Sequence, residues 1–128
     1  MNRTKWIWVV VLVLIVGGLL GWYFVDARTP GQYDGLATCL KDKGVIFYGA
    51  FWCPHCQEQK KLFGAKSTKF LPYVECSTAN GQDQLQVCKD AKIQSYPTWQ
   101  FADGSRLSQV LTPAELAEKT TCPLPASK

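Results

Sequence analysis

The pattern of apolar and polar positions divides the chain into an apolar N-terminal stretch and a mixed remainder. Residues 6–25 form an uncharged run of 20 residues, with tryptophans near both of its ends. At about 1.5 Å per residue, a helix of this length spans the roughly 30 Å hydrocarbon layer of a bilayer. Aromatic side chains at both ends suit the two membrane interfaces. The pattern therefore predicts one transmembrane helix over residues 6–25.

The charges that flank this run predict its orientation. Basic residues precede it within residues 1–5, whereas Asp26 and Arg28 after it cancel each other. Because basic residues stay on the cytoplasmic side, we expect residues 1–5 in the cytoplasm and the following domain in the periplasm or an equivalent extracytoplasmic lumen. A cleaved signal peptide is the alternative, although the run is longer than the usual h-region of about 7–15 residues. Both interpretations export the domain.

Residues 26–32 are predicted to form a short linker, and residues 33–128 one small domain. The apolar run at residues 45–48 is typical of a central strand buried on both faces. The expected elements are a helix from Asp34 as N-cap towards Gly44, a strand at 45–48, a helix over 53–63, a strand at 71–76, a short helix around 85–91, a strand after Pro97, a turn at 103–104, a return strand at 107–111 and a helix capped by Thr112. This order predicts an α/β domain with about four strands, the last two antiparallel.

Composition adds six cysteines to a chain of 128 residues. Such a content is typical of disulfide frameworks outside the cytoplasm, and of metal or catalytic sites inside it. A zinc site needs a second closely spaced cysteine pair or several histidines, and His55 is the single histidine of the chain. We therefore expect no metal. The net charge of +4 is scattered and forms no basic stripe with interleaved aromatics, so the sequence does not support nucleic-acid binding.

Cys53 and Cys56 form the candidate redox centre. Two cysteines three positions apart at the start of a helix lie one turn apart, close enough to form a disulfide. Free backbone N–H groups and the helix dipole stabilise a thiolate at Cys53, and the thiolate is the form that attacks disulfides. Pro54 suits the first helical turn. The competing interpretation is an inert disulfide of a small exported domain.

Several segments resemble the thioredoxin fold over roughly residues 34–122. The motif Cys53-Pro54-His55-Cys56 matches that of the bacterial periplasmic disulfide oxidases of the DsbA type, and the loop at 96–98 lies where the fold carries its cis-proline. A closer resemblance is to the thioredoxin-like domain that accompanies bacterial vitamin K epoxide reductase homologues. It is carried by residues 48–56, 62–64, 72–76 and 95–99. The resemblance implies a three-layer α/β/α sandwich.

The resemblance also implies roles for the motif residues. Cys53 is expected to be the more exposed attacking thiolate, and Cys56 the buried cysteine that resolves the mixed disulfide. Pro54 is expected to rigidify the first turn. His55 is expected to stabilise the Cys53 thiolate if its ring approaches that sulfur, which makes the disulfide more oxidising.

The substrate side of the site is expected to lie around three further residues. A cis bond before Pro97 is expected to set the backbone of Tyr96 beside Cys53, ready to pair with an extended substrate. Trp52 is expected to line the same surface. An ordinary trans proline and a core tryptophan are the alternatives.

Two features depart from the resembled group. In place of the fused reductase bundle we expect a single anchoring helix. Phe47 lies six residues before Cys53, where many thioredoxins carry a buried carboxylate that helps to deprotonate the second cysteine. The sequence therefore leaves open how Cys56 loses its proton.

The resemblance implies a structural disulfide between Cys76 and Cys88, which leaves Cys39 and Cys122 as the remaining pair. The alternative is that one of these pairs is a second redox relay.

Together these features predict a membrane-anchored thiol–disulfide oxidoreductase without a cofactor other than its own redox-active disulfide. We expect a dithiol oxidase of exported client proteins, reoxidised by a vitamin K epoxide reductase-like or other quinone-linked membrane protein. The alternatives are a periplasmic disulfide reductase or isomerase, for instance one serving cytochrome c maturation, and a non-catalytic binding module.

Overall fold

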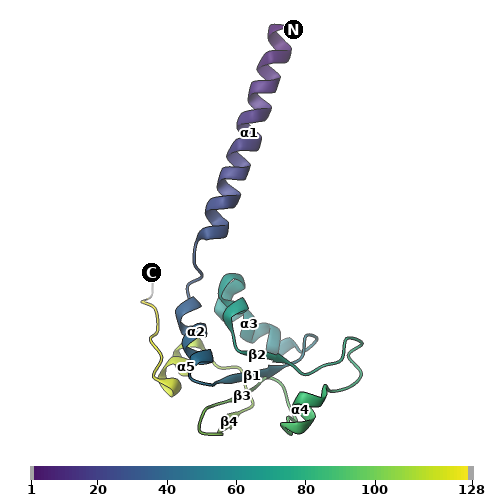
Figure 1. Ribbon diagram of the computed structural model, residues 1–128, viewed down its shortest axis with the longest axis vertical. Helices are drawn as coiled ribbons and strands as arrows, with labels where there is room; N and C mark the ends of the chain where they lie inside the picture. The colour runs from purple at the N-terminus through teal and green to yellow at the C-terminus, as the bar shows by residue number, and fades with distance from the viewer. Residues whose placement is uncertain (1, 127–128) are drawn as a thin grey trace. The chain divides into compact units, whose positions relative to one another are not determined.

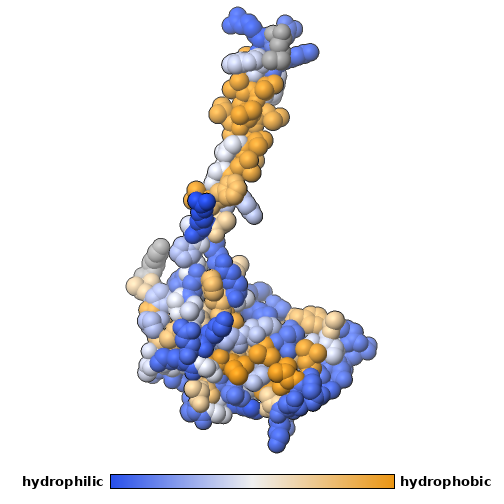
Figure 2. Space-filling view, in the orientation of Figure 1, coloured by the Kyte–Doolittle hydropathy of each residue, from blue (hydrophilic) through white to orange (hydrophobic). Residues whose placement is uncertain are grey.

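A computed structural model describes residues 2–126, and its contacts divide the chain into two compact units, Met1–Pro30 and Gly31–Lys128. The first unit is the helix α1 (Arg3–Arg28), drawn in purple in Figure 1. It extends beyond the run at residues 6–25 at both ends, so that Asp26–Arg28 are helical. Its apolar side chains are exposed, and Figure 2 shows them gathered along the visible face of the helix. By length and composition, α1 can cross a membrane.

The second unit is built on a mixed four-stranded sheet. Its strands are β1 (Ile46–Gly49), β2 (Tyr73–Glu75), β3 (Thr98–Gln100) and β4 (Arg106–Leu107), in the order β2-β1-β3-β4. β1 is parallel to β2 and antiparallel to β3, and β4 is antiparallel to β3. The predicted α/β class and the antiparallel pairing of the last two strands are confirmed.

Helices cover both faces of this sheet, which gives the three layers expected. They are α2 (Asp34–Asp42), α3 (Pro54–Ser67), the short η1 (Thr68–Phe70), α4 (Gln86–Asp90) and α5 (Pro113–Thr120). On one face, Phe47 stacks on Trp99 at 4.6 Å between ring centroids, in a core that includes buried side chains of α2, α3 and α5. On the other face, Tyr48 packs with Cys88 of α4 and Ile93. Figure 1 shows α4 apart from the other helices of the domain.

The start of α2 differs from the sequence prediction, and α3 consists of two helical segments. Tyr33, not Asp34, occupies the N-cap position of α2, because the Asp34 carboxylate turns back to accept the backbone N–H of Gly31 at 2.9 Å. At Gly64 the backbone leaves the helical conformation with a φ of +79°, so the first segment of α3 ends where the sequence predicts, and a second short segment continues across this kink to Ser67. The glycine permits this kink because it has no Cβ.

The return strand is also shorter than predicted, and begins one residue earlier. Only Arg106–Leu107 pair with β3, whereas the prediction ran over residues 107–111. The backbone N–H of Leu111 donates instead to Gln59 Oε1 at 2.8 Å, so this segment is tied to α3 rather than to the sheet. The predicted capping box of the last helix is confirmed: Thr112 and Glu115 exchange side chain–backbone hydrogen bonds.

Candidate active site

The cysteine pair lies just beyond the C-terminal end of β1. Cys53 is the N-cap of α3 rather than its first residue, with extended backbone angles, and Pro54 follows at the first helical position. Both thiols are free in this structure. Cys53 is 5% exposed and Cys56 is 0% exposed, so Cys53 is the more accessible of two buried cysteines. The Cys53 carbonyl accepts the N–H of Gln57, which starts the helix immediately behind the pair.

The loop before β3 faces this pair. The Tyr96–Pro97 peptide bond is cis, and the Cys53 thiol donates a hydrogen bond to the Tyr96 carbonyl oxygen at 3.7 Å. Thr98 Oγ1 donates to the Ser95 carbonyl at 2.8 Å, which holds the loop at the start of β3. The structure thus places the backbone of Tyr96 beside Cys53, with the cis bond before Pro97, as the sequence predicts.

Trp52 forms part of the rim of the site. Its side chain is 52% exposed, and its indole Nε1 donates to Ser77 Oγ at 2.8 Å. The ring also meets Tyr96 edge-on, at 6.1 Å between centroids. Trp52, Ser77, Gln84 and Tyr96 line a shallow groove beside the dithiol. Trp52 is therefore a surface residue of the site and not a core residue.

The side chain of His55 contacts Glu58 in this structure. Its Nδ1 lies 3.5 Å from Glu58 Oε2, and both side chains are well exposed. In this conformation the imidazole pairs with Glu58, one turn further along α3. An effect of His55 on the Cys53 sulfur stays a prediction.

Cys56 resists deprotonation in the folded protein. Burial, together with a smaller effect of the neighbouring Cys53, raises the pKa of the Cys56 thiol to about 12, although the backbone N–H of Ala50 and the charge of Lys60 oppose this rise. Phe47, which stacks on Trp99, offers no proton acceptor here. Position 47 therefore supplies no base that could take the proton from Cys56.

Two bridges tie the domain together. Cys39 and Cys122 are bonded and join α2 to the segment after α5, with Cα atoms 6.0 Å apart. Cys76 and Cys88 are bonded with Cα atoms 5.5 Å apart, and they close the loop that carries Ser77 and Gln84. The second bridge thus supports the side of the groove that holds Trp52.

Sequence reasoning missed Gln59, a buried polar residue on α3. Its Oε1 accepts from the indole N–H of Trp99 at 3.1 Å and from the Leu111 N–H at 2.8 Å. Its Nε2 donates to the Leu111 carbonyl at 2.7 Å. The helix that carries the dithiol is thereby fastened to β3 and to the segment before α5. The position of Gln59, between Cys56 and Phe63 on one helical face, was the available signal.

Sequence reasoning also missed a polar group on β2 and α3 that consists of Tyr73, Glu75 and Lys60. Alternate residues of a strand share a face, and Tyr73 pairs with Phe47 in register. Tyr73 and Glu75 therefore face the same side as Phe47, towards α3. The alternation of side chains along β2 was visible in the sequence, but the sequence does not show that this strand faces α3.

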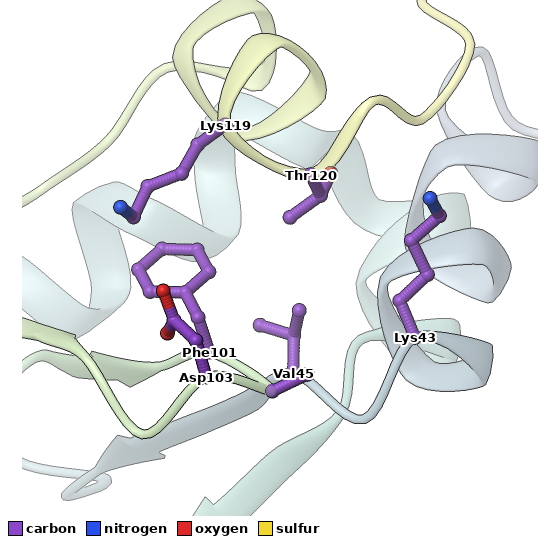
Figure 3. Close-up of a pocket in the computed structure, with 7 residues that line it drawn as sticks. Lys43, Val45, Phe101, Asp103, Lys119 and Thr120 are labelled. Carbon is purple, nitrogen blue, oxygen red and sulfur yellow. The ribbon is translucent and has the colours of Figure 1, made fainter.

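A second pocket lies at the opposite end of the central strand (Figure 3). Val45, which lines it, precedes β1, whereas Cys53 follows that strand. Lys119 reaches over the Phe101 ring with its Nζ 4.6 Å from the centroid, and Lys43 lies on the other side of Val45. This pocket is separate from the dithiol. Among residues 2–126, no group of three or more His, Cys, Asp or Glu side chains is placed to hold a metal ion.

A four-stranded mixed sheet, a Cys-x-x-Cys pair at the start of a helix and a facing cis-proline loop define a thioredoxin-fold protein with a dithiol site. Residues 29–120 match the family described as Thioredoxin, and the chain belongs to this family. Over 88 residues the chain is 47% identical to the thiol-disulfide oxidoreductase LTO1 of Arabidopsis thaliana. The alignment covers 66% of this chain and 23% of that relative, so the chain spans about a quarter of the relative's length. The family and this relative support an oxidoreductase.

Proposed function

We propose that this chain is a membrane-anchored thiol–disulfide oxidoreductase that oxidises the thiols of exported proteins. The observation that carries the proposal is the position of Cys53, at the start of α3 and 3.7 Å from the Tyr96 carbonyl. A sulfur at a helix N-terminus is stabilised as a thiolate by the free N–H groups and the dipole. The exposed Trp52 and the groove beside it provide room for an extended client chain.

The chemistry passes two electrons from a client dithiol to the Cys53–Cys56 disulfide. A client thiolate attacks Cys53 Sγ, the Cys53–Cys56 bond breaks, and Cys56 leaves as a thiolate that takes up a proton. A second client thiolate then attacks the client sulfur bonded to Cys53, which forms the client disulfide and releases the Cys53 thiolate. The buried position of Cys56 confines client attack to Cys53.

The membrane segment supports a site of action next to the bilayer. α1 exposes apolar side chains on every side, which is the pattern of a helix in lipid. With the N-terminus in the cytoplasm, as its basic residues favour, the dithiol acts in the periplasm or an equivalent lumen. We propose that a quinone-linked membrane protein of the vitamin K epoxide reductase type removes the two electrons from Cys53 and Cys56.

The proposal is tested with the full chain in detergent, oxidised at Cys53 and Cys56, and mixed with a reduced, unfolded protein that contains cysteines. The wild type is expected to transfer one disulfide per chain, whereas Cys53→Ser transfers none. Cys56→Ser, which cannot form the Cys53–Cys56 disulfide, is expected to transfer none either. A Ser105→Ala control in the β3–β4 turn leaves the transfer unchanged.

The same assay separates the alternatives. A protein that reduces disulfides at the expense of dithiothreitol, with a potential near the roughly −270 mV of thioredoxin, would be a reductase. A protein that exchanges no disulfide in either direction, with Cys53 and Cys56 intact, would be a binding module. Either result contradicts the oxidase proposal.

A further inference from the structure

Cys56 lies beside an aromatic side chain that the chemistry described so far does not use. A Cβ placed on Gly49 would come 2.7 Å from Tyr73 Cε2 and 3.0 Å from Cys56 Sγ. The Tyr73 ring and the Cys56 sulfur therefore border the same space, which stays open because residue 49 has no side chain. Gly49 pairs with Glu75 in the parallel register of β1 and β2, so this end of β2 faces the dithiol.

Lys60 brings a positive charge to the same place. Its Nζ lies 3.6 Å from the centroid of the Tyr73 ring, the arrangement in which the ring face attracts a cation. Lys60 is half-buried. It follows Cys56 by four residues on α3, so the two side chains share one face of the helix. The ammonium group of Lys60 thus lies over the Tyr73 ring, and this ring borders the Cys56 sulfur.

Glu75 holds the Tyr73 ring in this orientation. The Tyr73 hydroxyl donates to Glu75 Oε2 at 2.7 Å. The other carboxylate oxygen accepts the backbone N–H of Phe51 at 3.2 Å and that of Ser77 at 2.9 Å. The ring is therefore tied at its hydroxyl end to the loop that precedes Cys53.

The charged and titratable groups around Cys56 come from α3 with its N-cap and from β2. They are Cys53, Lys60, Tyr73 and Glu75. Burial, and then the hydrogen bond to Glu75, hold the pKa of Tyr73 well above its usual value, so its hydroxyl stays neutral. Among the side chains of this group, Lys60 is the one that lowers the pKa of Cys56.

We propose that Lys60, seated on the Tyr73 ring, is a positioning residue that stabilises the Cys56 thiolate when Cys56 attacks or leaves. This inference rests on the proposed function, and it assigns a group to the task that a carboxylate in place of Phe47 would serve. When a mixed disulfide at Cys53 resolves, the Cys56 thiolate attacks Cys53 Sγ and a Cys53–Cys56 bond forms. The partner leaves as a thiolate and takes up the proton that Cys56 has released.

The test follows this resolving step in the full chain in detergent, with Cys53 and Cys56 reduced. Glutathione disulfide is added, samples are quenched with acid between pH 6 and 9, and mass spectrometry counts the glutathione adduct. The formation and the decay of the adduct then report Cys53 and Cys56 separately. The variants are Lys60→Met and Lys60→Arg, with Lys119→Met as the matched control because Lys119 also lies over an aromatic ring.

Lys60→Met is expected to slow the decay of the adduct about fivefold or more at each pH, because it removes the positive charge that favours the Cys56 thiolate. Adduct formation stays unchanged in this variant. Lys60→Arg keeps the cation and restores the decay to within about twofold. In all variants the decay rate rises about tenfold per pH unit, since the Cys56 thiol is mostly protonated over this range. Lys119→Met matches the wild type.

A Lys60→Met variant that resolves the adduct as fast as Lys119→Met overturns the inference and leaves the proposed function standing. The inference is equally overturned if Lys60→Met slows formation and decay alike, because the effect would then not be on Cys56. A wild-type chain that forms no adduct with glutathione contradicts the proposed function itself, and the inference with it.

Discussion

The indole Nε1 of Trp52 donates a hydrogen bond of 2.8 Å to Ser77 Oγ. This contact joins the residue before the catalytic motif to the loop closed by the Cys76–Cys88 bridge. The rim of the dithiol site is therefore built from two segments, and its shape depends on both. A change in the loop that carries Ser77 therefore alters the surface that a client protein contacts.

Ser77→Ala is expected to weaken client binding without altering the chemistry at Cys53. The loss of one hydrogen bond frees the exposed Trp52 ring and costs about 1 kcal/mol, which raises the KM for a peptide client about fivefold. Steady-state kinetics with a cysteine-containing peptide measure this effect. An equal change in the Ser105→Ala control, which lies in the β3–β4 turn, would contradict it.

Gln59→Leu is expected to destabilise the domain markedly. It leaves the Trp99 indole N–H and the backbone groups of Leu111 buried without their partner. Unsatisfied buried groups cost about 1–3 kcal/mol each, so we expect a loss of roughly 3 kcal/mol in the free energy of unfolding. Thermal unfolding measures it. Gln86→Leu, which removes an exposed bond to Asp90, is the control and should change little.

The two bridges are expected to differ in their effects. Replacing Cys39 and Cys122 by alanine opens a loop with a sequence separation of 83, whereas the Cys76–Cys88 loop has a separation of 12. Loop-closure entropy predicts losses of about 4–5 and about 3 kcal/mol, respectively. The shorter bridge, however, holds the loop that carries Ser77.

Denaturant unfolding and client kinetics, measured on both double variants, separate stability from function. We expect the larger loss of stability without the Cys39–Cys122 bridge, and the larger rise in KM without the Cys76–Cys88 bridge. The opposite ranking in either measurement would contradict the assigned role of that bridge.

The raised pKa of Cys56 predicts how the redox potential of the pair depends on pH. A thiol that is still protonated binds a proton on reduction, and this proton makes the potential fall by about 30 mV per pH unit. Because burial raises the pKa of Cys56 from 9.0 to about 12, the fall should continue between pH 9.5 and 11. Equilibration with a dithiol buffer of known potential measures it. A potential that levels off above pH 10 would show that Cys56 titrates as an ordinary thiol.

The apolar helix α1 predicts firm membrane attachment. Full-length chain in cells is expected to stay in the membrane fraction under alkaline carbonate, and its intact mass should include residues 1–25. A shorter mature chain that begins near Asp26 and is released in soluble form would instead establish a cleaved signal peptide.

The elements of the fold that could be predicted are those that a short stretch of sequence defines by itself. The run at residues 45–48, the capping box of Thr112 and the turn at Asp103-Gly104 each define an element by themselves. The return strand was placed one residue late and too long, because Leu111 is bound by a side chain 52 positions away in sequence. No local pattern contains that partner.

The site also consists of residues that the sequence reveals and residues whose contact depends on the fold. The cysteine motif and the Tyr96-Pro97 loop are visible as short segments, and the structure brings them together. Lys60, Tyr73 and Glu75 belong to two elements whose contact depends on the parallel pairing of β1 and β2. Their relation to Cys56 follows from that register and from the absence of a side chain at Gly49.

The central claim, that Cys53 exchanges disulfides with exported proteins, is tested most directly by trapping in cells. Cys56→Ser removes the resolving thiol, so mixed disulfides at Cys53 persist. Non-reducing gels and mass spectrometry should then show adducts of this variant with exported thiol proteins that disappear with dithiothreitol and in the Cys53→Ser, Cys56→Ser double variant. A Cys56→Ser chain that is present in the membrane and carries no such adducts would contradict the claim.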